Sequence, residues 1–139
     1  MSFGSAAARR GRRLPAVDPC PCGSGQDFSA CCGPILDGAP ARSPETLMRS
    51  RYTAFALGDV DHLLSSWHPT TRPETLELED TWEWRRLDIV RAQDQGTHGI
   101  VEFRAHWHDA TAHTVGELHE VSRFRQAAGR WFYVDGDAE

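Results

Sequence analysis

The sequence predicts an α+β protein in which helices pack against one face of an antiparallel sheet, after a small cysteine-rich segment. Two segments with helical periodicity, 43–57 and 59–68, come first, and strand-like alternation follows over 82–134. Helices followed by a run of strands are typical of the α+β class. All four cysteines lie within thirteen residues near the start of the chain. A length of 139 residues allows one ordinary domain and an appendage.

The four cysteines follow the pattern C-x-C, eight residues, C-C, and are Cys20, Cys22, Cys31 and Cys32. Thiolates that converge in so short a segment suit a tetrahedral zinc site. Two disulfides, as in small secreted domains, or redox-active thiols are the alternatives. No apolar stretch follows the first arginines, so we expect no secretory signal, a cytoplasmic protein and reduced thiols. We therefore predict a zinc ion, on which residues 18–34 fold because they cannot bury a core.

The segments on either side of the cysteines lack periodicity, and the charge balance is acidic. We predict that residues 1–17 form a flexible tail and that residues 35–42 form a linker. Fifteen basic residues, all arginine, oppose 20 acidic ones, and the net charge of −5 does not favour nucleic-acid binding. The tail arginines from Arg9 to Arg13 are the exception and could contact RNA or an acidic protein. The absence of lysine excludes a Walker loop and Schiff-base chemistry, and no apolar run is long enough to predict a membrane span.

Two helices are predicted between the linker and the strands. Ser43 supplies a hydroxyl cap for the helix over 43–57, and Gly58 ends it. The second helix, over 59–68, ends where a proline follows, because the residue before proline avoids helical angles. Arg51 falls in the middle of the apolar face of the first helix, so it must reach water or find a carboxylate. The inward positions are Leu47, Met48, Ala54 and Phe55 in the first helix and Val60, Leu63, Leu64 and Trp67 in the second.

Four strands are predicted in the second half of the chain. The alternation of apolar and polar residues changes parity near Arg85 and Arg86, which indicates either a bulge in the first strand or a later start of that strand. Clean alternation over 101–107 indicates a half-buried antiparallel strand. Glu120 shares one side of the third strand with Leu118, Ser122 and Phe124. If that side meets the helices, Glu120 enters the same interior as Arg51, and we expect the two to form a charge-assisted pair.

Several motifs resemble those of a known family. Cys20-Pro-Cys-Gly-Ser-Gly25 and Cys31-Cys-Gly33 resemble the SEC-C motif, the zinc knuckle first noted at the C-terminus of the SecA translocation motor. Leu47-Met-Arg-Ser-Arg-Tyr52, Trp67-His-Pro69, Glu120-Val-Ser-Arg-Phe124 and Gly129-Arg-Trp-Phe-Tyr-Val-Asp-Gly136 resemble the YchJ-type family of uncharacterised bacterial proteins. The resemblance covers about residues 18–136. It implies a zinc knuckle followed, over 43–136, by a cone-shaped α+β domain with a curved sheet, similar to nuclear transport factor two, and it implies no settled reaction.

A pocket inside the cone is the second candidate site. In enzymes that resemble this fold, acids and histidines in the pocket abstract protons or assist dehydration. We expect the pocket to contain Arg51, Tyr52, Trp67, His68, Glu120 and Ser122, and the acid–base candidates are Glu120, His68, Asp135 and Tyr52. An acid paired with an arginine has a lowered pKa, which suits a structural link better than a general base, so we lean against an enzyme. Four histidines surround one hairpin, namely His106, His108, His113 and His119. They could form a second metal site, but exposed polar positions are the ordinary explanation.

Two function classes remain. In the first, the protein is an adaptor whose zinc knuckle docks a protein or ribosome-associated partner, as the similar SecA motif does with a chaperone or ribosome. In the second, the cone pocket binds or transforms a small molecule and the knuckle is structural. The closed four-thiolate set favours the first class, because a catalytic zinc keeps an open position. A deep apolar cavity containing Glu120 or His68 without an ion-pair partner would favour the second.

Overall fold

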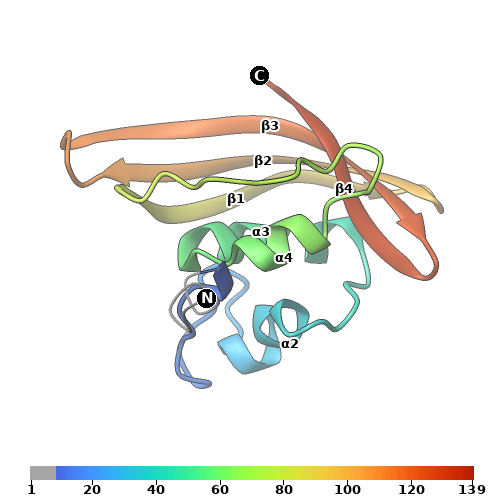
Figure 1. The fold of residues 1–139 in the computed structure, drawn as a ribbon, viewed down its shortest axis with the longest axis horizontal. Coiled ribbons are helices and arrows are strands. Elements are labelled where there is room, and N and C mark those ends of the chain that lie inside the picture. The colour runs from blue at the N-terminus through green and yellow to red at the C-terminus, as the bar shows by residue number, and fades with distance from the viewer. Residues whose placement is uncertain (1–8) are drawn as a thin grey trace.

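The computed structural model describes residues 9–139 and contains one four-stranded sheet with helices on one face (Figure 1). The elements are η1 (Phe28–Ala30), α2 (Cys32–Leu36), α3 (Pro44–Leu57), α4 (Val60–Ser65), β1 (Trp82–Asp94), β2 (His98–Asp109), β3 (Thr114–Ala127) and β4 (Arg130–Ala138). Helix α3 contacts β1, β2 and β4 on its sheet side, and α2 contacts α3. The molecule therefore has a sheet layer, a layer of α3 and α4, and the cysteine segment beyond them (Figure 1). The predicted α+β class is confirmed.

The ends of α3 follow its capping residues, as predicted. The Ser43 hydroxyl accepts a hydrogen bond from the Thr46 amide at 3.1 Å, and Gly58 ends the helix with φ of 78°. Helix α4 ends at Ser65, one turn earlier than expected. The reason is a tertiary contact, because the backbone after α4 turns to pair with β4. The Tyr133 amide donates to the Ser66 carbonyl at 2.8 Å, and the His68 amide donates to the Tyr133 carbonyl at 2.7 Å.

The sheet is an antiparallel meander in the order β1-β2-β3-β4. A register shift between Trp84 and Arg86 confirms the bulge that the parity change predicted, and a second lies between Ile89 and Arg91. A third shift, at Arg123, interrupts the pairing of β3 with β4. Bulges bend a strand and increase its twist, which accounts for the curvature of the sheet around α3.

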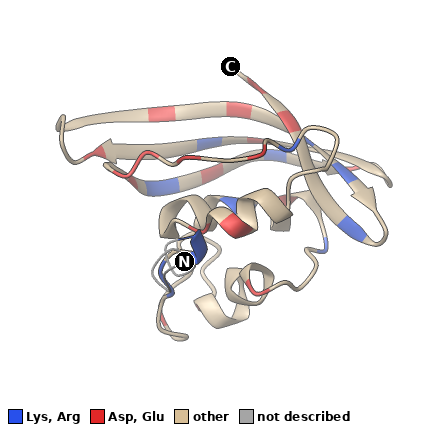
Figure 2. Cartoon of the chain, in the orientation of Figure 1, with Lys and Arg blue, Asp and Glu red and all other residues tan. Residues whose placement is uncertain are grey.

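The two faces of the sheet differ in polarity. The inner face is mostly apolar and buries Leu87, Val101, Phe103, Ala105, Ser122 and Phe124. Charges of both signs are interspersed over the strands (Figure 2).

Histidines around the hairpin contact acidic side chains. His106 contacts Asp88 at 3.0 Å, His108 contacts Glu83 at 2.9 Å and His119 contacts Glu102 at 2.7 Å. Three of the four histidines around the hairpin are thus paired with carboxylates, and the fourth, His113, is exposed at the turn. In residues 9–139 the only cluster of metal-ligating side chains is the cysteine cluster.

The segments that we expected to be tail and linker make defined contacts where the structure describes them. The Arg12 amide donates to the Leu57 carbonyl at 3.0 Å, and Arg13 forms an ion pair with the buried Asp59 at 3.1 Å. Arg9 pairs with Asp61 at 2.8 Å. Residues 1–8 of the expected tail lie outside the described residues. The expected linker begins inside α2, and its residue Leu36 is buried. No helix within residues 9–139 is long and apolar enough to cross a membrane.

Candidate functional site

The four cysteines converge on one point. Their sulfur atoms all lie within 4.8 Å of one another. The Cys22 and Cys31 sulfurs are 3.6 Å apart, and those of Cys31 and Cys32 are 4.0 Å apart. Sulfurs at about 2.3 Å from a metal in a tetrahedron are separated by about 3.8 Å, so this geometry fits a tetrahedral ion. A disulfide requires about 2.05 Å, and all four cysteines are free, so the two-disulfide alternative does not hold in this structure.

Short loops bring the two cysteine pairs together. Cys20 and Cys22 flank a tight turn in which the Gly23 amide donates to the Cys20 carbonyl at 3.2 Å. Gly23 has φ of 79°, a left-handed conformation that glycine adopts without steric cost. Cys31 follows η1, and Cys32 begins α2. The spacing in the sequence thus places all four sulfurs on one side of a compact knuckle, residues 18–34.

Polar groups of α3 and of the knuckle surround the sulfur cluster. The Thr53 hydroxyl donates to the Cys32 sulfur at 3.3 Å and lies 3.9 Å from the Cys20 sulfur. The Ser24 hydroxyl lies 3.1 Å from the Cys31 sulfur. Arg49 donates from Nη1 to the Cys22 carbonyl at 2.8 Å. Such groups orient thiolate ligands and moderate their charge. They also tie the knuckle to α3, so the two form one body.

The thiols of the cluster differ in acidity. The pKa of Cys22 is lowered because the side chains of Cys20 and Cys32 hydrogen-bond to its sulfur. Burial raises the pKa of Cys31 to about 11, and hydrogen bonding to Cys20 and Cys22 raises the pKa of Cys32. Crowded thiolates repel one another, so the protein groups alone hold only part of the cluster ionised. A divalent cation would remove this conflict. Four sulfur ligands with no open position are typical of a structural metal site.

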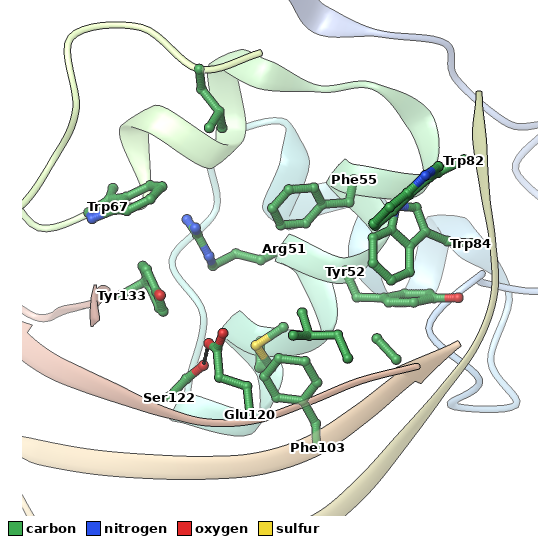
Figure 3. Close-up of a pocket in the computed structure, with 14 residues that line it drawn as sticks. Arg51, Tyr52, Phe55, Trp67, Trp82, Trp84, Phe103, Glu120, Ser122 and Tyr133 are labelled. Atoms are coloured by element: carbon green, nitrogen blue, oxygen red, sulfur yellow. Dashed lines mark hydrogen bonds between the residues drawn. The ribbon is translucent and has the colours of Figure 1, made fainter. Parts of the chain in front are cut away.

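The second candidate site is a cavity of about 230 Å³ between α3 and the inner face of the sheet (Figure 3). Most of its wall is apolar, and two wall residues come from the segment between α4 and β1. The lining residues are Met48, Arg51, Tyr52, Phe55, Trp67, Leu76, Trp82, Trp84, Phe103, Ala105, Leu118, Glu120, Ser122 and Tyr133.

Arg51 is a buried cation at one end of the cavity. It is 3% exposed, and its Nη1 donates to the Leu63 carbonyl at 2.8 Å and to the Ser66 hydroxyl at 2.7 Å. Its guanidinium carbon lies 4.4 Å from the centre of the Tyr133 ring and 5.1 Å from that of Trp67, as in cation–π contacts. Burial lowers the pKa of Arg51 to about 10, so the guanidinium stays charged at neutral pH.

Glu120 enters the same cavity, as expected, but does not form the expected ion pair with Arg51. No ion pair joins these two side chains in the described structure, because Arg51 is directed to the end of α4 and held between two rings (Figure 3). The Glu120 carboxylate instead accepts a hydrogen bond from the Ser122 hydroxyl at 2.6 Å. A Cβ at Gly136 would overlap this carboxylate, so a side chain at position 136 would displace it.

Five of the six expected pocket residues line the cavity, and His68 does not. The His68 ring lies 2.8 Å from the Thr70 hydroxyl and packs edge-on against Phe132. Asp135 is paired with Arg123. Trp84 also lines the cavity. The sequence interpretation missed Met48, Phe55, Leu76, Trp82, Phe103, Ala105, Leu118 and Tyr133 as lining residues. The strand residues among them sit at apolar positions of the alternation, whereas Leu76 comes from a loop that carries no periodic signal.

Comparisons with known proteins match two parts of the chain. Residues 18–34 match the SEC-C motif, and residues 43–136 match the description "YchJ, middle NTF2-like domain". A UPF0225 protein of Streptomyces coelicolor is 44% identical over 123 residues, which cover 86% of this chain and 94% of the relative.

Two solved structures are also similar. The solution structure of a SEC-C motif containing protein from Rhodopseudomonas palustris has a TM-score of 0.77 and 35% sequence identity, and the match covers 86% of this chain and 98% of that one. The crystal structure of a SEC-C motif containing protein from Psychrobacter arcticus has a TM-score of 0.72 and 23% identity over 89% of this chain and 84% of that one. The second likeness concerns the fold alone.

Proposed function

The chain belongs to the YchJ family and carries a SEC-C motif before its NTF2-like domain, and from this premise we propose that it binds a small molecule in the cavity beneath its sheet. The observation that carries the proposal is a largely apolar cavity that contains both Arg51 and Glu120, whose hydrogen-bond partners in the structure are other groups and not each other. This is the condition that favours the ligand-binding class over the adaptor class.

The cost of burying the charge of Arg51 supports the proposal that the cavity binds a ligand. A buried charge is costly unless a partner compensates it, and Arg51 is almost wholly removed from water. A titratable group in a cavity whose pKa is strongly perturbed by burial is a candidate for a functional site. An apolar cavity of about 150 Å³ is enough to bind benzene in another protein. The cavity of about 230 Å³ therefore has room for one substituted ring.

The cavity can be tested by filling it. Ala105 lines the cavity from β2 and is 3% exposed, so Ala105→Leu places a larger side chain in the binding space. The purified chain is incubated with the small-molecule fraction of a bacterial extract and examined by native mass spectrometry. We expect a bound mass that Ala105→Leu loses and that Ala112→Leu, at an exposed turn position, retains. Two results would contradict the proposal: Ala105→Leu retains the bound mass as Ala112→Leu does, or the folded wild-type chain shows no bound mass.

We further propose that the ion in the knuckle is zinc and that its role is structural. Three of its four ligands are buried, and the knuckle is bonded to α3. Zinc has no redox chemistry and prefers tetrahedral sulfur ligands. We expect metal analysis to give one equivalent of zinc per chain, with no thiol that reacts before the metal is removed. Metal-free protein with two disulfides, or stoichiometric iron, would overturn this assignment.

A second candidate function is the adaptor role, with the knuckle docking a protein partner. It is favoured by a groove of about 1050 Å³ beside the half-exposed Cys31, between the knuckle and the start of α3. Gln26 lies on the exposed rim of this groove. Gln26→Arg changes the rim and leaves the cysteines in place. If the groove docks a partner, a protein captured by the wild-type chain is lost with this variant and kept with Gln95→Arg, an exposed control in the turn before β2. Equal capture by both variants excludes docking at this rim.

A further inference from the structure

We propose that the ligand of the cavity is a neutral, single-ring aromatic molecule whose polar head both donates and accepts hydrogen bonds, as a primary carboxamide does. This inference rests on the proposed function and adds the chemical class of the ligand. It follows from the polarity of the two ends of the cavity, from their charges and from the available volume.

The cavity has an aromatic end and a polar end. Phe55, Trp82 and Trp84 lie together at one end, and Arg51, Glu120 and Tyr133 lie toward the other (Figure 3). Trp84 meets Phe55 at a ring-centre distance of 6.1 Å and Trp82 at 5.9 Å. Ring faces and edges arranged in this way accept a further aromatic ring in offset or edge-to-face contact. The aromatic end therefore determines the body of the ligand.

The polar end offers donors and an acceptor together. Both protein hydrogen bonds of the Arg51 side chain come from Nη1, and the described residues supply no acceptor for its Nε and Nη2. One oxygen of Glu120 accepts from Ser122, which leaves the other oxygen for a donor. A ligand head group that accepts a hydrogen bond from Arg51 and donates one to Glu120 provides a partner for both side chains. A carboxamide carries a carbonyl acceptor and an N–H donor on one plane, which matches this demand.

The charges exclude the charged alternatives. Arg51 and Glu120 bring one positive and one negative charge into the cavity, so its net charge is near zero. A carboxylate head would pair with Arg51 but face Glu120, and an ammonium head would pair with Glu120 but face Arg51. Each would also lose its own hydration on entry, which is costly in a cavity with mostly apolar walls. A neutral head avoids both penalties.

Four probes that share one ring test this assignment, namely benzamide, benzoate, benzylamine and toluene. Each is titrated into the full, metal-loaded chain, and binding is followed by tryptophan fluorescence, because Trp67, Trp82 and Trp84 line the cavity. We expect benzamide to bind at least tenfold more tightly than each of the other three. Equal binding of toluene and benzamide, or preference for either charged probe, overturns the inference.

Replacing the carboxylate provides a sharper test, because it should change the preference. Glu120→Gln keeps the size of the side chain and a hydrogen-bond acceptor but removes its negative charge. The positive charge of Arg51 then gives the cavity a net positive charge. We expect benzoate to become the preferred probe of this variant. An unchanged order of affinities means that Glu120 does not select the ligand, and the inference fails. Gly136→Ala, whose methyl group would displace the Glu120 carboxylate, is the second variant, and we expect it to lose the advantage of benzamide.

The outcomes separate this inference from the proposed function. If benzamide and toluene bind equally and Ala105→Leu abolishes both, the cavity binds small molecules but the assignment of the head group is wrong. If none of the four probes binds the folded protein, both the cavity function and the ligand class fail.

Discussion

At the scale of single residues, Arg51 serves the cavity at a cost to folding. Its pKa is lowered to about 10 by burial, so its surroundings disfavour the charge. Burying a charge that no opposite charge pairs is costly, and an apolar residue of similar volume does not carry that cost. We predict that Arg51→Met leaves the free energy of unfolding in urea unchanged or raises it by about 1 kcal/mol, while benzamide binding is lost. Arg125→Met, at an exposed strand position, is the control. A loss of stability above about 2 kcal/mol relative to that control would mark Arg51 as a structural residue.

Another buried residue, His62, makes stability depend on pH. It lies 2.9 Å from the Ser50 hydroxyl, and burial lowers its pKa from 6.5 to about 3. Between these values the unfolded chain binds a proton that the folded chain does not, so stability is full above pH 6.5 and falls as the pH decreases toward 3. The slope from this group is at most about 1.4 kcal/mol per pH unit.

Urea unfolding at several pH values between 7.5 and 4.5 measures this contribution. We expect His62→Gln to reduce the loss of stability across this range, and His113→Gln, at an exposed turn, to leave it as in the wild type. Identical slopes for the wild type and His62→Gln would show that His62 does not control the acid response.

At the scale of elements, α3 is the link between the two candidate sites. It carries Arg51 into the cavity and Thr53 to the sulfur of Cys32. Thr53→Val removes the hydroxyl and keeps the shape of the side chain. Loss of a group that orients a metal ligand typically lowers metal affinity about 10- to 100-fold. We predict a decrease of about tenfold in competition with a chelator, and no change for Thr75→Val on the exposed loop. Equal metal affinities of Thr53→Val and Thr75→Val would show that the Thr53 hydroxyl does not support metal binding.

The elements also show what local sequence rules can predict. Ser43 and Gly58 determined the ends of α3, and the parity change near Arg85 located a bulge, because these features depend on neighbouring residues alone. The end of α4 depends on pairing with Tyr133, far along the chain, and was predicted wrongly. Arg51 was correctly placed in the interior, but its partners proved to be a carbonyl, a hydroxyl and two rings, which periodicity cannot identify.

The same distinction holds for the candidate sites. The sulfur cluster could be predicted because its four ligands lie close together in the sequence and their spacing constrains them. The cavity was predicted only in part, since its wall combines α3, all four strands and two residues, Trp67 and Leu76, of the segment between α4 and β1. His68 was misplaced because the chain after α4 turns toward β4 and takes its ring outside the cavity.

At the scale of the whole molecule, one hydrophobic core extends from the knuckle to the sheet. Three of the cysteines belong to the same buried cluster as Leu47, Phe103 and Trp131. Loss of the metal should therefore destabilise the entire chain. We predict that a chelator lowers the midpoint of thermal unfolding by more than about 5 °C, and that adding zinc back restores it. An unchanged midpoint in protein shown to be metal-free would mean that the domain folds independently of the knuckle.

Binding in the cavity is the central claim, and an NMR titration of ¹⁵N-labelled, metal-loaded protein with benzamide tests it most directly. The five tryptophans provide the signals and their own control. Trp67, Trp82 and Trp84 line the cavity, whereas Trp131 is buried elsewhere in the core. We predict saturable shifts of the indole N–H signals of the three lining tryptophans and none for Trp131. No saturable shift in any of them, or equal shifts in all, would contradict the claim.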